Sequence, residues 1–209
     1  MAHLVSVNVG RPKQIAVRRG RPLMSAIGKA PVDHRVRVEG VNVAGDDQAD
    51  RSVHGGPDKA IYAYASEDAA WWAAALEREV GPGMFGENLT TAGVDVSGAV
   101  IGEIWRIGTV TLQVAQPRFP CAKLGLRFAD IRMVKRFGEA NRPGAYLRIL
   151  VEGELGAGDR VDISGRPSHG VTIAQVARAV LLDEDGLAAA AAAPELPASL
   201  SRWMLERAA

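Results

Sequence analysis

A single cysteine lies in a segment whose residue types favour thiolate chemistry. Cys121 is the only cysteine of the chain, and it follows Arg118 and two prolines and precedes Lys123. Prolines restrict the backbone, and cations near a thiol favour the thiolate, the form that attacks carbon or binds a soft metal. Taken alone, the segment still favours an inert thiol, because free cysteines are often simply buried.

A second group of polar residues spans the loop from Gly45 to Lys59. This loop offers acids, the imidazole of His54 and glycine N–H groups that could hold an anion. The alternative is a solvated turn, because Gly, Asp and Pro are the usual loop residues. No second His or Cys lies at the spacing of a zinc site.

A third group runs from Gly83 to Thr91, where closely spaced glycines precede Glu87, Asn88 and Thr90. Backbone without side chains could approach a ligand there, although the spacing matches neither a phosphate loop nor a dinucleotide fingerprint. The alternative is a connection from a helix to a strand. Basic residues earlier in the chain could meet a phosphate or could serve solubility alone: Arg18, Arg19, Arg21, Lys29 and Arg35.

Short strands with glycine and proline punctuation must position these groups. Alternating or strand-rich runs are predicted at residues 3–9, 34–39, 60–64, 101–107, 109–115, 146–151 and 160–163. Their uneven spacing favours a closed or partly closed barrel. Two helices should interrupt the sheet, one over 67–80 capped by Ser66 and one over 126–139.

The pattern becomes helical after Pro167. Three helices are predicted, from Thr172 onward, over 187–193 and from about Ser199. We therefore expect a mainly β domain with interrupting helices over 1–167 and a small three-helix domain over 168–209.

The composition narrows the class of protein. The chain has 209 residues, 47% hydrophobic and 23% charged, with a formal net charge of +1. These values are ordinary for a globular protein and give no broad basic field for nucleic acid. We expect no membrane span, no secretory signal and a cytoplasmic location. One cysteine excludes an intrachain disulfide, a Cys-based zinc ribbon and a protein-held iron–sulfur cluster.

Three strings together resemble the MOSC domain family, named for the molybdenum-cofactor sulfurase C-terminal domain, and in particular its YiiM-like subgroup. They are His54-Gly-Gly-Pro-Asp-Lys-Ala60, Phe85-Gly-Glu-Asn-Leu-Thr90 and Gln116-Pro-Arg-Phe-Pro-Cys-Ala-Lys-Leu124. The resemblance implies a MOSC-type β-barrel with a small C-terminal helical domain. It also implies binding of molybdenum cofactor, a pterin dithiolene with a terminal phosphate. Cys121 would then be the metal ligand or sulfur acceptor.

The same resemblance implies roles for the other residues. Lys29, with Arg21 nearby, would meet the phosphate. His54, Asp58 and Lys59 would line the cofactor or position the substrate. Glu87, Asn88 and Thr90 would hydrogen-bond the pterin or fix their own loop. Arg118 would be a further cofactor contact. No pyridoxal phosphate is expected, because the large sulfurase domain is missing from this sequence.

The implied activity is reduction of N-hydroxylated small molecules such as hydroxylaminopurines and amidoximes. The cofactor would remove the N–O oxygen, His54 would supply a proton, and a separate electron-transfer protein would supply electrons. The C-terminal helices are candidates for a docking surface or for the dimerisation surface of a homodimer. The alternatives are a non-catalytic carrier of cofactor or sulfur and a cofactor-free hydrolase using Cys121 and His54. The hydrolase is less supported, since no oxyanion element or orienting acid is identifiable.

Overall fold

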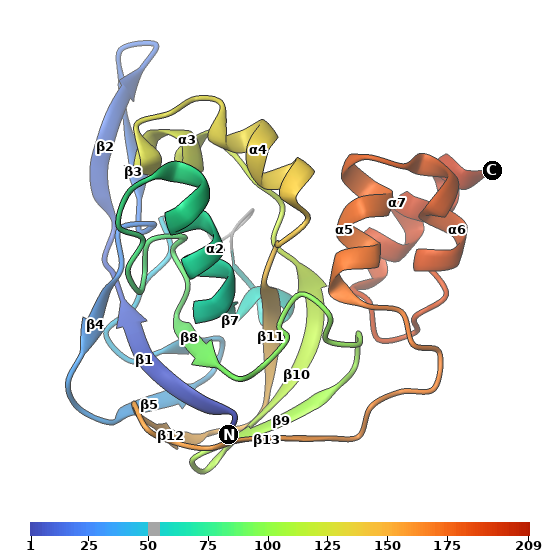
Figure 1. The fold of residues 1–209 in the computed structure, drawn as a ribbon, viewed down its shortest axis with the longest axis horizontal. Helices are drawn as coiled ribbons and strands as arrows, with labels where there is room; N and C mark the ends of the chain where they lie inside the picture. The colour runs from blue at the N-terminus through green and yellow to red at the C-terminus, as the bar shows by residue number, and fades with distance from the viewer. Residues whose placement is uncertain (50–54) are drawn as a thin grey trace.

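A mixed sheet with helices on its surface forms the framework of the protein (Figure 1). The computed structural model describes residues 1–49 and 55–209. Within them, an eight-stranded sheet runs in the order β13 (Val161–Ser164), β9 (Ile104–Ile107), β10 (Val110–Pro117), β11 (Ala145–Val151), β7 (Ile61–Ala65), β8 (Leu89–Ala92), β1 (His3–Val9) and β4 (Ala30–Val32). Neighbours are antiparallel except β7 and β8, which are parallel.

The sheet formed by the described residues is curved but does not close into a barrel. Its strand order ends at β13 on one side and at β4 on the other. Backbone bonds nevertheless join the start of β1 to the chain entering β13, from Leu4 N to Asp159 O (2.8 Å) and from Gly158 N to Leu4 O (2.8 Å). A third backbone bond, from Val161 N to Ala2 O (3.1 Å), and a bridge between His3 and Arg160 extend this contact. The expectation was a closed or partly closed barrel: no closed barrel is formed, because the strand order is open, and the short pairing of β1 with the chain entering β13 closes the sheet only in part.

Two smaller sheets flank the main one. Strands β12 (Gly153–Leu155), β5 (Val36–Glu39) and β6 (Asn42–Val43) form the first. The second is a hairpin of β2 (Lys13–Arg18) and β3 (Arg21–Ser25), which projects beyond the rest of the ribbon (Figure 1). The hairpin was not predicted from the sequence.

Both predicted interrupting helices differ from expectation at their ends. Helix α2 (Ser66–Leu76) has Ala65 at its N-cap, so Ser66 lies inside the helix and makes no cap bond. Glu77 adopts a left-handed conformation (φ 51°) and ends it before residue 80. The segment expected as one helix over 126–139 is two helices, α3 (Ala122–Phe128) and α4 (Met133–Ala140). Ala129 is left-handed (φ 51°) and ends α3, since such a residue cannot continue a right-handed helix.

These helices cover a second, aromatic-rich core beside the main one. Trp72, Tyr64, Phe85, Phe128 and Phe137 are buried together. The indole Nε1 of Trp72 donates to the hydroxyl of Tyr64 (2.9 Å), so the buried polar atoms of the two largest rings satisfy each other. Helices α3 and α4 contribute Phe128 and Phe137 to this core.

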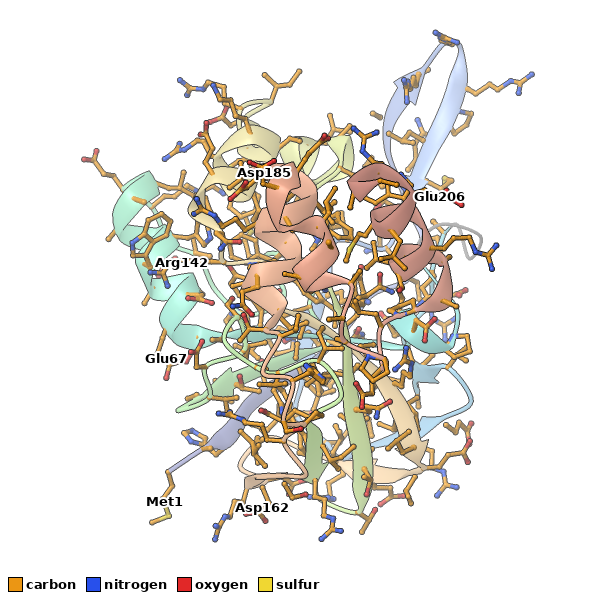
Figure 2. The ribbon with its side chains drawn as sticks, turned by 90° about the vertical axis from the view of Figure 1, so that its right-hand side faces the viewer. Met1, Glu67, Arg142, Asp162, Asp185 and Glu206 are labelled. Atoms are coloured by element: carbon orange, nitrogen blue, oxygen red, sulfur yellow. The ribbon has the colours of Figure 1, made fainter. Side chains whose placement is uncertain are left out.

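The C-terminal segment forms helices α5 (Ile173–Leu181), α6 (Leu187–Ala190) and α7 (Ala198–Ala208), with short 3-10 turn η2 (Glu184–Gly186) between the first two. Thr172 and Gln175 form a capping box that begins α5. These helices stand together at one side of the sheet (Figures 1 and 2). Their apolar residues Ile173, Leu187 and Met204 join the same hydrophobic cluster as the sheet. No helix among the described residues is long and apolar enough to cross a membrane.

A buried carboxylate organises the turn that enters β8. Glu87 accepts bonds from the backbone N–H of Gly83 (2.6 Å) and Phe85 (3.0 Å) and from the hydroxyl of Thr90 (3.0 Å). Burial raises the pKa of Glu87, and these donors act in the opposite direction by favouring the carboxylate. The side chain of Glu87 is thus occupied in holding its own turn.

The Glu87→Gln variant should unfold more easily than the wild type, by about 1–3 kcal/mol, because an amide cannot accept from both backbone donors. The free energy of unfolding from urea titration measures this loss. Glu79→Gln, at an exposed position, is the matched control and should change stability by less than about 0.5 kcal/mol. Equal stability of the two variants would contradict this role for Glu87.

Candidate active site

A concave pocket opens where four loops and the ends of two strands meet. Its volume is about 680 Å³, including space open to solvent. It is lined by the chain after β3, the loop at 46–49, the turn at 85–88 and the segment at 118–123. Tyr62 of β7 and Tyr146 of β11 complete its described lining, together with Lys59. The pocket combines apolar and aromatic surface with a few charged groups, as small-molecule sites do.

Cys121 lies in this pocket, half-buried, at the junction between a strand and a helix. Strand β10 ends at Pro117, and α3 begins directly after Cys121. The carbonyl oxygen of Cys121 accepts the N–H of Leu124 (2.9 Å), which fixes the backbone at the start of the helix. The thiol is therefore held by its backbone while its side chain faces the pocket with Lys123.

Arg118 is a buried cation with an unsatisfied nitrogen. Only 5% of its surface is exposed, and its Nη1 has no hydrogen-bond partner. Among residues 1–49 and 55–209 no carboxylate forms a salt bridge with it; its guanidinium instead lies over the rings of Phe137 (5.0 Å) and Tyr62 (5.8 Å). Aromatic faces offset part of the burial penalty of a cation but neutralise no charge. Such a group can receive an anion.

Two tyrosines line the pocket, Tyr62 and Tyr146. The hydroxyl of Tyr62 donates to the carbonyl of Pro143 (2.8 Å). The ring of Tyr146 packs on that of Tyr62 with 5.2 Å between centroids. Burial raises the pKa of Tyr146, Arg118 lowers it and Cys121 raises it. Tyr146 is thus a protonated phenol next to both the thiol and the guanidinium, and it was not among the site residues expected from sequence.

Lys29 lines the pocket and also fixes its wall. Its ammonium group pairs with the carboxylate of Asp46, which also accepts from the N–H of Gly10 (2.8 Å) and from Nδ2 of Asn88 (2.9 Å). Burial lowers the pKa of Lys29, and Asp46 opposes that effect. The loop at 46–49 is therefore tied to three separate segments through Asp46, which sequence reasoning did not single out.

Asp58 and Lys59 are adjacent in the short 3-10 helix η1 (Pro57–Lys59) but have different surroundings. Lys59 lines the pocket, and burial lowers its pKa. The carboxylate of Asp58 pairs instead with Arg148, whose Nη1 also donates to the backbone oxygen of Glu195 (2.7 Å). Asp58 thus connects η1 to β11 and the C-terminal segment.

The remaining expected residues divide in the same way. Asn88 lines the pocket, whereas Glu87, in the turn before β8, and Thr90, in β8, bond to each other and are not in the lining. His54 lies outside the described residues. The structure therefore brings together Cys121, Arg118, Lys29, Lys59 and Asn88, and adds Asp46, Tyr62 and Tyr146.

The donor set of the pocket fits an anionic cofactor that carries most of its own metal ligands. Within the described parts of the chain, no group of three or more His, Cys, Asp or Glu side chains could hold a metal ion. The pocket instead offers one thiol for a soft metal and an unsatisfied guanidinium for an anionic group. Two lysines, Lys59 and Lys123, add positive charge at its lining.

Comparison with known proteins gives a consistent picture. The model of the MOSC domain matches residues 50–162. The chain is 32% identical to protein YiiM of Escherichia coli (strain K12), over 99% of this chain and 93% of that protein. It is 33% identical to a protein named reductase from Gibberella moniliformis, over 93% of this chain but 35% of that protein. The crystal structure of YiiM from Geobacillus stearothermophilus superposes with a TM-score of 0.82 at 31% identity and full coverage of both chains.

The MOSC match covers more than half of the chain, and the similarity to YiiM extends over nearly all of it. The fold agrees with that of a solved YiiM along its whole length. The chain therefore belongs to the MOSC domain family and is YiiM-like.

Proposed function

We propose that this protein is a molybdenum-cofactor-dependent oxidoreductase that reduces N-hydroxylated small molecules to the corresponding amines. The observation that carries the proposal is one pocket holding a thiol, a buried cation with a free donor and a protonated phenol: Cys121, Arg118 and Tyr146. Membership of the MOSC family and similarity to a relative named reductase support the redox assignment.

The residues that would hold the cofactor follow from the chemistry of the pocket. The thiolate of Cys121 would bind the molybdenum, and Nη1 of Arg118 would donate to an anionic oxygen of the cofactor. Lys59 and Lys123 would add charge attraction, while Asn88 and Lys29 would contribute polar contacts. When bound, the cofactor supplies a metal that accepts an oxygen atom and passes electrons.

The overall reaction consumes electrons and protons. An N-hydroxylamine, two electrons and two protons give an amine and one water molecule. Tyr146 lines the pocket, and its hydroxyl would donate a proton there, with Arg118 stabilising the phenolate that results. His54 remains the sequence-based candidate for the same role.

In this proposal the electrons reach the pocket from a redox centre outside these 209 residues. One cysteine cannot hold an iron–sulfur cluster, and the sequence carries no dinucleotide-binding fingerprint. In the fungal relative, the region similar to this chain is 35% of the protein, so most of that reductase lies outside it. A non-catalytic carrier of the cofactor is the second candidate, because the same pocket would serve it.

Replacing Cys121 with Ser should abolish molybdenum retention, because a hard alcohol is a poor substitute for a thiolate on a soft metal. The protein is made in a host that assembles the cofactor, and molybdenum is measured by mass spectrometry per mole of protein. The wild type should approach one molybdenum per chain, and the variant should fall at least about tenfold below it.

The control for that measurement is Ser199→Ala, an exposed change in α7 that should leave the metal content as in the wild type. Equal molybdenum in Cys121→Ser and wild type would contradict the assigned ligand. Metal-loaded wild type that never reduces an N-hydroxylated base with a chemical electron donor would favour the carrier.

The pH profile should separate the two proton donors. Because the pKa of Tyr146 is raised above 10.0, this phenol stays protonated and active up to at least about pH 9. A histidine donor would instead lose its proton, and the rate would fall above roughly pH 6.5.

Tyr146→Phe should lower kcat by about 100-fold or more at all pH values between 6 and 9. Tyr64→Phe is the matched control: its hydroxyl bonds the backbone of Arg142 (3.0 Å) outside the pocket, so stability should fall while kcat does not. A wild-type rate that falls above pH 6.5, with full activity in Tyr146→Phe, would transfer the role to His54.

A further inference from the structure

Positive charge is concentrated in the first part of the chain. Residues 1–32 contain six of the 25 basic residues and none of the 24 acidic ones. The remaining residues therefore carry 19 basic and 24 acidic side chains, a net charge of −5. The formal net charge of +1 conceals this separation, and five of the six cations lie on or just before the β2–β3 hairpin: Arg11, Lys13, Arg18, Arg19 and Arg21.

The tip of the hairpin brings like charges together. Arg18 and Arg21 are directly paired across the two strands, and Arg19 lies in the turn between them with a positive φ of 50°. All three are exposed, and none forms an ion pair within the described chain. Like charges opposite each other in a sheet are destabilising, and so is a left-handed arginine. The fold thus keeps a locally unfavourable arrangement at a protruding tip (Figures 1 and 2).

The base of the hairpin is part of the candidate active site. Strand β3 ends at Ser25, and Ser25, Ala26, Ile27 and Lys29 all line the pocket. A molecule bound along the hairpin would therefore lie next to the pocket that contains Cys121. The same hairpin exposes two apolar side chains, Val17 and Met24, whose exposed fractions are 63% and 40%. They give it a small apolar surface.

We propose that the β2–β3 hairpin is the docking surface for an acidic one-electron carrier protein of the flavodoxin or [2Fe–2S] ferredoxin class, which delivers its electrons to the adjacent pocket. This inference rests on the proposed reductase function. Two reduced carriers each lose one electron, and the two electrons with two protons convert one N–OH group to N–H and water. Electron-transfer complexes are small and electrostatically steered, which a narrow basic hairpin can satisfy.

The hairpin suits a protein better than a nucleic acid. Residues 10–25 contain no Phe, Tyr or Trp on which bases could stack. A second copy of this chain also carries negative charge, since its residues 33–209 have a net charge of −5, so hairpin-dependent self-association is measured as a competing outcome that would overturn the proposal. Binding to single-stranded nucleic acid or to anionic vesicles is measured as a competing outcome.

The test reverses two charges in metal-loaded full-length protein. The variant Arg18→Glu/Arg21→Glu keeps one like-charge pair across the hairpin, so its folding penalty is similar to that of the wild type. Neither arginine is in the lining of the pocket, so Arg21, expected from the sequence near the cofactor phosphate, is not among the proposed cofactor contacts. The matched control Arg106→Glu/Arg202→Glu makes the same change in net charge at exposed positions on β9 and α7. Reduction of an N-hydroxylated base is followed with reduced flavodoxin, with reduced ferredoxin and with dithionite-reduced methyl viologen.

The hairpin variant should lose at least about tenfold in kcat/KM for flavodoxin or ferredoxin, and the wild-type rate should fall steeply with added salt. Its viologen-driven rate and both rates of the control should stay near wild type. Equal loss with viologen, no loss with either carrier, or equal loss in the control would overturn the proposal.

Direct binding separates this proposal from the proposed function. If viologen supports no turnover in the wild type, the reductase function fails, and calorimetry with oxidised flavodoxin and ferredoxin still tests the docking surface. Hairpin-dependent binding to a carrier supports it. Hairpin-dependent binding only to a single-stranded 20-mer or to phosphatidylglycerol vesicles overturns it.

Discussion

The buried guanidinium of Arg118 is the constraint around which the candidate site is organised. A cation at 5% exposure without a carboxylate partner among the described residues is expensive to hold, because burying charge costs several kcal/mol. The aromatic core offsets this through the rings of Phe137 and Tyr62. Helix α4 supplies Phe137 and strand β7 supplies Tyr62. The separate aromatic core therefore also holds the cation of the candidate site. Arg118 lines the pocket, and its buried Nη1, which has no hydrogen-bond partner, is the donor that the proposed cofactor would use.

The loops around that cation are held by carboxylates as well as by apolar packing of Ile27 and Phe85. Asp46 joins Lys29, Gly10 and Asn88, and Glu87 joins two backbone donors and Thr90. Close backbone approach accompanies these bonds: a Cβ on Gly83 would lie 2.6 Å from the carbonyl oxygen of Lys29, and the φ of Gly83 is +78°. Glycine is therefore required where the turn meets the pocket wall. The result is a pocket whose walls are preorganised before any ligand arrives.

The sequence was most informative where chemistry depends on residue type. Cys121, Arg118, Lys59, Lys29 and Asn88 were singled out in sequence, and all line one pocket. The sequence was less informative about the direction in which a side chain points. A buried carboxylate such as Glu87 can face a ligand or its own backbone, and only the fold decides between the two. Asp58 and Tyr146 illustrate the same limit. Asp58 pairs with Arg148, and Tyr146 lies in the same pocket as the thiol only because β10 and β11 pair.

Local backbone features explain the elements that differed from expectation. The apolar spacing over 126–139 was helical on both sides of Ala129, and a left-handed residue there has no signature in composition. The β2–β3 hairpin turns at Arg19 and Gly20 rather than at the usual Asn-Gly, and its strands are too exposed to alternate clearly. Closure of a sheet depends on contacts between distant strands, so an open sheet and a barrel share the same strand pattern.

A crystal structure of the protein purified from a host that makes molybdenum cofactor tests the central claim most directly. The account predicts electron density for the cofactor in the pocket between Cys121 and Arg118, with Sγ of Cys121 bound to molybdenum and Nη1 of Arg118 within hydrogen-bond distance of an anionic oxygen. A cofactor bound elsewhere on the protein, or one in the pocket that contacts neither side chain, would contradict it.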